Sequence, residues 1–155
     1  MIRRIGIIIG GILLVLAAVW TGSGGRFFAT AAPDAREWVG GSLAQHAKLV
    51  SNSRCIGNVD SRAPDPTDGS KTVVMGWGWD VKAKTLPKAA LFVAAGNKIA
   101  GVAQPGVSRP DVPKALPEVT SDKAGWNGVL PGNTGEVTTY LLLSTGEACP
   151  LGQAK

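Results

Sequence analysis

The sequence predicts an all-β fold, a small antiparallel β-sandwich that follows an N-terminal transmembrane or signal-anchor helix and a short juxtamembrane helix. The strongest signal is Lys71–Asp80, K-T-V-V-M-G-W-G-W-D, which alternates with the period of two typical of β-strands. The chain also holds 21 glycines and 10 prolines in 155 residues, a composition that suits short strands joined by turns. Six further short apolar runs supply the remaining strands of a sandwich.

We expect Lys71–Asp80 to be the central core strand. Gly76 and Gly78 lie on one of its faces, where another group can approach the backbone closely. The opposite face carries most of the apolar bulk and is expected to contact the core. Its residues are Val73, Met75, Trp77 and Trp79.

The other strands are separated by turn residues, among them Arg62–Gly69 and Gly96–Asn97. Gln104–Pro117 is rich in proline and predicts an irregular loop. The expected strands are Cys55–Asp60, Ala89–Ala94, Ile99–Ala103, Gly125–Leu130, Glu136–Ser144 and Glu147–Leu151.

Residues 1–25 predict a membrane anchor or a signal peptide. Arg3 and Arg4 precede the uncharged run Ile5–Trp20, and this order favours an N-terminus in the cytoplasm. An uncleaved anchor would contact membrane lipid through residues 5–20. A cleaved signal peptide would use the small residues Ala29–Ala31 as its cleavage site, and both interpretations stay open.

Residues 26–53 are predicted to form a linker and an amphipathic helix over Asp34–Val50. Residues 54–155 are predicted to form the β-sandwich domain. Asp34 is a suitable N-cap, and Trp38 and Leu43 belong to an apolar stripe at helical spacing. We expect Trp38 and Leu43 to contact a partner protein. Alternatively, the stripe covers the core of the sandwich itself.

The two cysteines, Cys55 and Cys149, lie at the two ends of the predicted β-domain. In an exported chain this placement predicts a disulfide bond. The single histidine, His46, lies outside that region and no C-x-x-C motif is present, so we expect no metal site. Asp65 and Asp68 supply too few oxygen ligands for calcium and are expected to stabilise a turn.

The formal charge of +5 is concentrated at the N-terminus. Three of the 16 basic residues lie in the first 31 positions, which hold no acid, and the remainder carries about +2. A nucleic-acid partner is therefore not expected.

The sequence predicts no enzyme and no cofactor. A serine hydrolase needs a histidine near its nucleophile, and His46 precedes the β-domain. A glycosidase needs two carboxylates across a cleft, yet Asp80 and Asp111 are the only acids inside motifs. No phosphate-binding glycine-rich loop is present.

Three polar residues, Asp80, Arg109 and Asp111, and three tryptophans are the candidate structural or binding residues of the β-domain. We expect Asp80 to pair with Arg109 and so hold the proline-rich loop, although both side chains facing a ligand is the alternative. Trp77 and Trp126 are expected in the core. Trp79, at a strand end, is the best candidate for an exposed, sugar-stacking indole, although we expect it to pack in the core or at its edge.

The motifs G-W-G-W-D, R-P-D-V and G-W-N-G follow one another between Cys55 and Gly152. Their order resembles a β-sandwich module of bacterial cell-envelope proteins, which often follows multi-span glycosyltransferase-like membrane domains and carries the pattern G-W-A-x-D, R-x-D-V and G-F/W. The matching residues are Gly76, Trp77, Asp80, Arg109, Asp111, Val112, Gly125 and Trp126.

These observations lead to two functional hypotheses. The first is a non-catalytic accessory or structural subunit, tethered by one span to a bacterial inner membrane, with its β-domain in the periplasm and docked on a larger membrane or envelope complex. The second is a carbohydrate-binding module that acts on envelope glycans. Exposed aromatic side chains in a row would favour the second hypothesis, and a single large apolar patch continuous with the anchor would favour the first.

Overall fold

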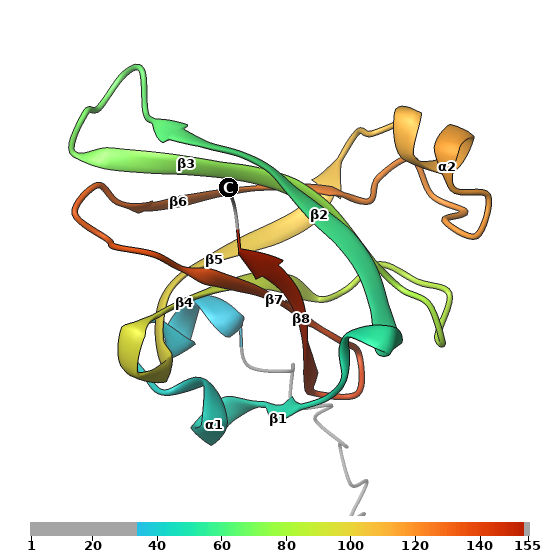
Figure 1. Cartoon of the computed structure of the whole chain (residues 1–155), viewed down its shortest axis with the longest axis horizontal. Helices are drawn as coiled ribbons and strands as arrows, with labels where there is room; N and C mark the ends of the chain where they lie inside the picture. Colours follow the sequence, from blue (N-terminus) through green and yellow to red (C-terminus); the bar gives the residue numbers. More distant parts are fainter. Residues whose placement is uncertain (1–33, 154–155) are drawn as a thin grey trace, which may run out of the picture. The chain divides into compact units, whose positions relative to one another are not determined.

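The computed structural model describes residues 34–153, and these form an all-β unit (Figure 1). The eight strands make one continuous sheet in the order β1-β8-β7-β4-β5-β6-β3-β2. All neighbours are antiparallel except β1 and β8. The strands are β1 (Lys48–Leu49), β2 (Cys55–Pro64), β3 (Lys71–Asp80), β4 (Ala89–Ala94), β5 (Lys98–Val107), β6 (Gly125–Pro131), β7 (Thr138–Leu142) and β8 (Glu147–Gln153).

The all-β class is confirmed, and the strands form a curled sheet whose two halves share β5. The first part of β5 pairs with β4, and its end pairs with β6. The start of β2 thereby comes close to β8 (Figure 1), where Cys55 and Cys149 form the expected disulfide with a Cα–Cα distance of 6.3 Å. Because no backbone ladder joins β2 to β8 within residues 34–153, this disulfide links the two strands covalently where hydrogen bonds do not.

The inner face of the curled sheet holds the main core. Trp126 of β6 is fully buried, as expected, and packs edge-on against Phe92 of β4 with ring centroids 5.6 Å apart. This core also includes Cys55, Val74, Ala90, Ala103, Leu130, Val137, Leu141, Leu143 and Cys149.

The bounds of β3 are as predicted, but its position and its faces are not. β3 is the neighbour of the edge strand β2, so it is not central. Its glycine face points into the core, because a Cβ atom at Gly76 would collide with the Trp126 ring and one at Gly78 would lie 2.5 Å from Leu141. Large residues from other strands therefore occupy the inner side, and the bulky residues of β3 point outward.

The predicted helix over Asp34–Val50 is wrong. Asp34 does act as an N-cap, since it accepts a hydrogen bond from the Arg36 amide at 3.0 Å, but the 3₁₀ turn η1 ends at Trp38. Gly40, with a φ of +91°, then turns the chain out of the helical path. The segment contains only the short elements η1 (Ala35–Trp38), α1 (Leu43–His46) and β1, followed by η2 (Asn52–Arg54).

This N-terminal segment covers the outer face of half of the sheet. Leu43 is 1% exposed and packs, with Ala35 and Ala47, against outward residues of β4, β5, β7 and β8. Consequently β4 is buried on both faces, as its almost unbroken apolar sequence requires.

The structure also tests the expected loop over Gln104–Pro117 and the expected hairpin at Gly96–Asn97. Gln104–Pro117 is not an irregular loop throughout, because β5 continues to Val107 by pairing with β6, and α2 spans Asp111–Ala115. The hairpin at Gly96–Asn97 is confirmed as the short turn η3 (Ala95–Asn97), in which both residues have positive φ.

The expected anchor at residues 5–20 lies outside the described residues. Among those described, no helix is long and apolar enough to cross a membrane.

Candidate functional site

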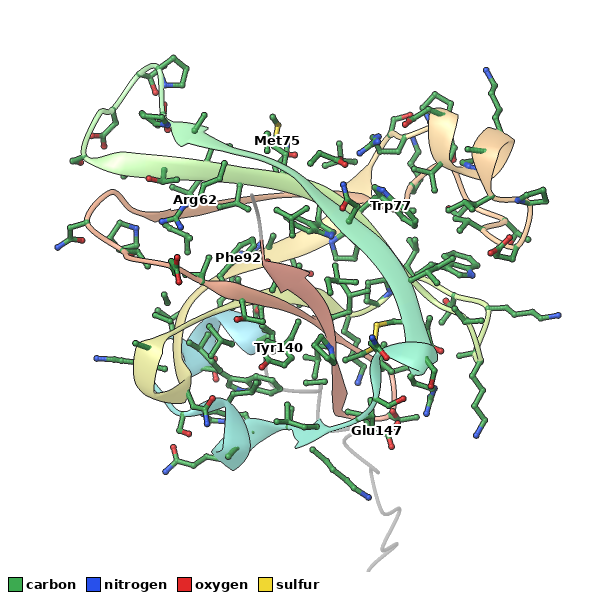
Figure 2. The ribbon with its side chains drawn as sticks, in the orientation of Figure 1. Arg62, Met75, Trp77, Phe92, Tyr140 and Glu147 are labelled. Atoms are coloured by element: carbon green, nitrogen blue, oxygen red, sulfur yellow. A yellow bond between two sulfur atoms is a disulfide. The ribbon has the colours of Figure 1, made fainter. Side chains whose placement is uncertain are left out.

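Part of the outer face of β3 and β6 is exposed. Val73 of β3 lies opposite Val129 of β6, and Met75 and Trp77 follow along β3 (Figure 2). Met75 and Val129 are 42% and 51% exposed, whereas Val73 and Trp77 are partly buried. We call Val73, Met75, Trp77 and Val129 the open face.

An ion pair crosses the open face between Met75 and Trp77. Arg109, which follows β5, reaches over β6 and β3 and binds the Asp60 carboxylate of β2 through its Nη1. Gly125 leaves room for this path, because a Cβ atom there would lie 2.7 Å from Arg109 Cγ. Asp60 reaches the arginine from a β-bulge between Val59 and Ser61.

Hydrogen bonds with two carboxylates favour the charged form of the Arg109 guanidinium and hold the group in one orientation. Its Nε and Nη2 atoms donate to the Asp111 carboxylate at 3.0 and 2.7 Å, and Asn58 donates to Asp60 at 2.9 Å. The bond with Asp111, followed by that with Asp60, raises the pKa of Arg109 above its usual value. In turn, the bond from Arg109 lowers the pKa of Asp111. The group is therefore a permanent, oriented cation between two carboxylates.

The expected pair of Asp80 and Arg109 is wrong. Asp80 lies at the far end of β3, where the β2–β3 register places Cys55 opposite it and brings the neighbouring Arg54 within reach. Asp80 Oδ1 is 3.6 Å from Arg54 Nε and accepts hydrogen bonds from the amides of Lys82 and Ala83. Asp80 thus holds the turn after β3 and not the loop that contains Arg109.

Arg54 connects that buried aspartate to the start of β8. Its Nη1 atom donates to Glu147 Oε2 at 2.9 Å, and Thr145 donates to the same oxygen at 2.7 Å. The hydroxyl of Thr145, and then the charge of Arg54, lower the pKa of Glu147. The chain Asp80–Arg54–Glu147 ties η2, β3 and β8 together beside the disulfide.

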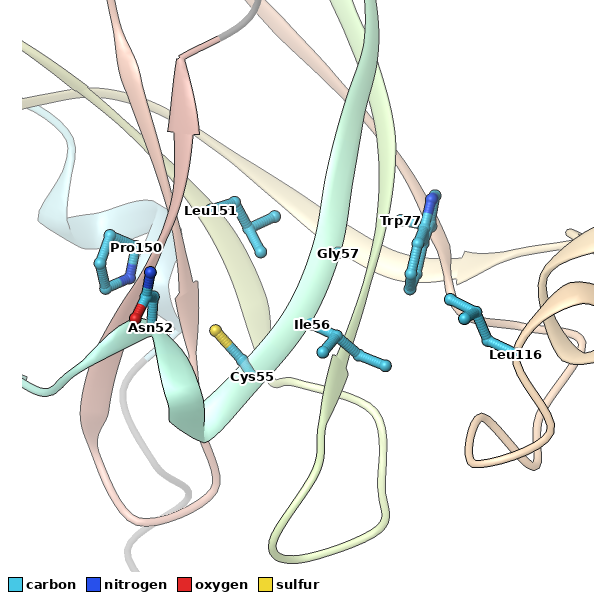
Figure 3. Close-up of a pocket in the computed structure, with 8 residues that line it drawn as sticks. All are labelled: Asn52, Cys55, Ile56, Gly57, Trp77, Leu116, Pro150 and Leu151. Carbon is cyan, nitrogen blue, oxygen red and sulfur yellow. The ribbon is translucent and has the colours of Figure 1, made fainter.

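A shallow depression of about 570 Å³ extends across the edge of β2 (Figure 3). Ile56, Trp77 and Leu116 line it on one side of the strand, and Asn52, Pro150 and Leu151 line it on the other. Gly57 lies between the two sets, so the depression is continuous over the strand. The open face therefore ends in an apolar hollow next to Trp77.

The tryptophans of β3 differ in burial. Trp79 is only 2% exposed, as its expected packing requires, because residues of the α2 region, including Val112 and Val119, cover it, so the sugar-stacking alternative does not apply to this residue. The expected burial of Trp77 in the main core is wrong, since this side chain is half-buried beside the same cluster. Trp77 is thus the tryptophan of β3 that a ligand can reach.

The two expected partner contacts lie on the covered half of the sheet. Leu43 is buried inside the domain, so the alternative interpretation, in which the stripe covers the domain's own core, describes it correctly. Trp38 is half-buried and stacks on His46 with ring centroids 4.8 Å apart.

Asp65 and Asp68 stabilise turns, as expected. Asp65 accepts from the amide and hydroxyl of Thr67, and Asp68 from those of Ser70. Over residues 34–153 no group of three or more histidine, cysteine or acidic side chains is arranged to hold a metal ion.

Sequence reasoning missed Asp60, Arg54, Met75 and Val129 as site residues. Asp60 and Arg54 lie far in sequence from their partners, and only the strand register brings each pair together. For Met75 the signal was present in Gly76 and Gly78, which indicate that the other face of β3 must accommodate large side chains.

Comparisons of the chain with protein-family models, with curated proteins and with solved structures found no match. The geometry itself suits binding. An apolar strip with one fixed cation and two carboxylates can bury an aliphatic surface and orient polar groups of the bound molecule.

Proposed function

We propose that this protein is a non-catalytic accessory subunit, tethered to a bacterial inner membrane by its N-terminal segment, whose periplasmic β-domain binds a larger membrane protein through the open face. The arrangement of the sheet supports the proposal. One half of its outer face is buried under residues 35–47, whereas Met75 and Val129 on the other half are left largely in water. Exposed apolar residues grouped in this way are typical of protein-binding surfaces.

Two further observations support the proposed location. The disulfide between Cys55 and Cys149 suits an oxidising compartment. The uncharged run Ile5–Trp20 follows two arginines, which is the pattern of a membrane segment with a cytoplasmic N-terminus.

A partner protein is the better occupant of the open face because its two exposed side chains, Met75 and Val129, are aliphatic and lack the flat ring that stacks on a sugar. Its one aromatic residue, Trp77, is partly buried against the cluster around Trp79. The Arg109–Asp60 pair adds a polar contact at which a partner side chain can be oriented, and such mixed surfaces are typical of non-obligate interfaces.

The test compares two single variants of the full chain. Val129→Glu places charge on the open face at a side chain that is 51% exposed, and Val39→Glu does so elsewhere at a side chain that is 50% exposed. Each protein is purified from native membranes in mild detergent after photo-cross-linking from position 73. We expect a cross-linked partner that the first variant loses and the second retains. Equal retention in both variants would refute docking on the open face.

One observation favours glycan binding as a second candidate. Trp77 is half-buried, and the hydrogen-bonding groups of Asn58, Asp60 and Arg109 lie beside it on the outer face. Together they have the composition of a sugar subsite. The unchanged protein should then sediment with purified envelope glycans, Trp77→Ala should abolish this, and Met75→Glu should preserve it. If the unchanged protein does not sediment, or if Trp77→Ala still does, glycan binding at Trp77 is refuted.

A further inference from the structure

Positive charge is gathered at one end of the sheet. Lys48, Arg54 and Lys82 line a second surface depression together with Thr145, Gly146 and Glu147. Lys84 belongs to the same turn as Lys82, and all three lysines are exposed. We call Lys48, Arg54, Lys82 and Lys84 the basic end.

The acidic groups near the basic end are already engaged. Glu147 is bound to Arg54 at 2.9 Å, and Asp80 is fully buried beneath the turn. Within residues 34–153 the exposed Lys48, Lys82 and Lys84 form no ion pair, so these lysines can contact an anionic surface.

The turn that carries Lys82 and Lys84 is held in one shape before any contact forms. Asp80 Oδ1 accepts from the amides of Lys82 and Ala83 at 3.1 and 2.9 Å, and the Asp80 amide donates to the carbonyl of Thr85 at 3.0 Å. Lys84 adopts a positive φ of 52°, which closes the turn. A turn fixed in this way loses little conformational entropy on binding.

We infer that the basic end contacts an anionic lipid surface and sets the orientation of the β-domain on the membrane. The inference rests on the proposed membrane tether. Lys48 lies on β1, and Lys82 and Lys84 lie in the turn after β3; a surface of lipid headgroups can contact both without further shape complementarity. Leu49 is 51% exposed next to Lys48, so lysine and an aliphatic group are available at the same edge, as in proteins that lie on lipid.

Lysine acetylation of the full chain in nanodiscs tests this contact directly. The rate at each lysine is measured by mass spectrometry in discs of phosphatidylcholine alone and in discs containing phosphatidylglycerol. We expect acetylation of Lys48, Lys82 and Lys84 to slow about fivefold in the anionic discs, because each lysine near such a surface gains about this factor. High salt should restore the rates by screening. The internal controls Lys98, Lys114 and Lys123, exposed elsewhere, should not change.

The outcomes separate this inference from the tether. Incorporation into both kinds of disc with unchanged rates at the basic end overturns the inference and leaves the tether standing. Equal slowing at all six lysines also overturns it. If soluble polyglutamate protects these lysines and anionic discs do not, the basic end binds an acidic polypeptide and not lipid, and the inference is wrong. If the chain does not enter phosphatidylcholine discs, the proposed tether is wrong. Salt-sensitive protection of the three lysines by added anionic discs would then still support the lipid contact. If that protection is also absent, both the tether and the lipid contact are refuted.

Discussion

Removal of the disulfide should destabilise the domain more than an ordinary core substitution. Cys55 and Cys149 are 94 residues apart, and in the chain-entropy model a loop of that size contributes about 4–5 kcal/mol to the free energy of unfolding. The structure also explains why the link between β2 and β8 should matter for stability. Within the described part of the chain, no ladder of hydrogen bonds holds β2 against β8, so side-chain contacts alone remain there when the bond is lost.

The assay is urea unfolding of the full chain in mild detergent, followed by tryptophan fluorescence, to which the buried Trp79 and Trp126 contribute. Cys55→Ala with Cys149→Ala is compared with the oxidised protein. With an m-value of about 2 kcal/mol/M, the midpoint should fall by roughly 2 M. Both cysteines are buried, so the alanine variant also creates a small cavity.

A chemically reduced sample of the original chain separates the two effects. It keeps both sulfur atoms and lacks only the covalent link, so it should lose nearly as much stability as the alanine variant. A loss below about 1.5 kcal/mol in the reduced protein would refute the reasoning, because the contacts between β2 and β8 would then suffice without the link.

Three further predictions concern single residues. Gly78→Ala places a methyl group 2.5 Å from Leu141 and should lower the free energy of unfolding by about 1–3 kcal/mol in urea titrations. Asp80→Ala leaves the largely buried Arg54 without that partner and frees two turn amides, and it should cost about 3–5 kcal/mol in the same assay. A hydrogen bond from Lys71 lowers the pKa of Asp68 from 3.8 to about 2, so its contribution to stability is present above pH 4 and is lost as the pH falls towards 2. Asp68→Asn should remove this part of the dependence of the urea midpoint on pH.

Each of these predictions has a matched control. Gly135→Ala adds the same methyl group in open space and should be neutral, so equal costs at both glycines would contradict the steric argument. Asp111→Asn removes a carboxylate that is also bound to an arginine but is 63% exposed and screened by solvent, so it should cost much less stability than Asp80→Ala. If Asp68→Asn leaves the pH dependence unchanged between pH 4 and 2, the pair with Lys71 does not contribute.

The sequence predicted the parts of the fold that depend on local pattern. Lys71–Asp80 and Ala89–Ala94 are strands with the expected bounds, because an alternating or continuous apolar run between turn residues has few other structures available. The disulfide followed from the position of two cysteines. The burial of Trp126 followed from its place in a strand motif.

Long-range register could not be predicted from the sequence. The orientation of β3 depends on Trp126 and Leu141, which fill the space above its glycines from strands about 50 or more residues away. The partner of Arg109 depends on a bulge that turns Asp60 toward it. The segment after Asp34 carries a stripe with helical spacing, but Gly40 ends the helix and the stripe is used by short elements that pack on the sheet.

The strand order also has a consequence for the time course of folding. β2–β3, β4–β5 and β7–β8 are hairpins of consecutive strands, and such units form within about 1–10 μs. β6 pairs with β3 and β5, both of which precede it in the chain, and the connection from β5 to β6 contains α2 and is too long for a tight hairpin. The first two hairpins are thus complete in a growing or translocating chain before the strand that joins them is available. Insertion of β6, which brings Trp126 into the core, is the non-local step that we expect to set a folding time of milliseconds to seconds.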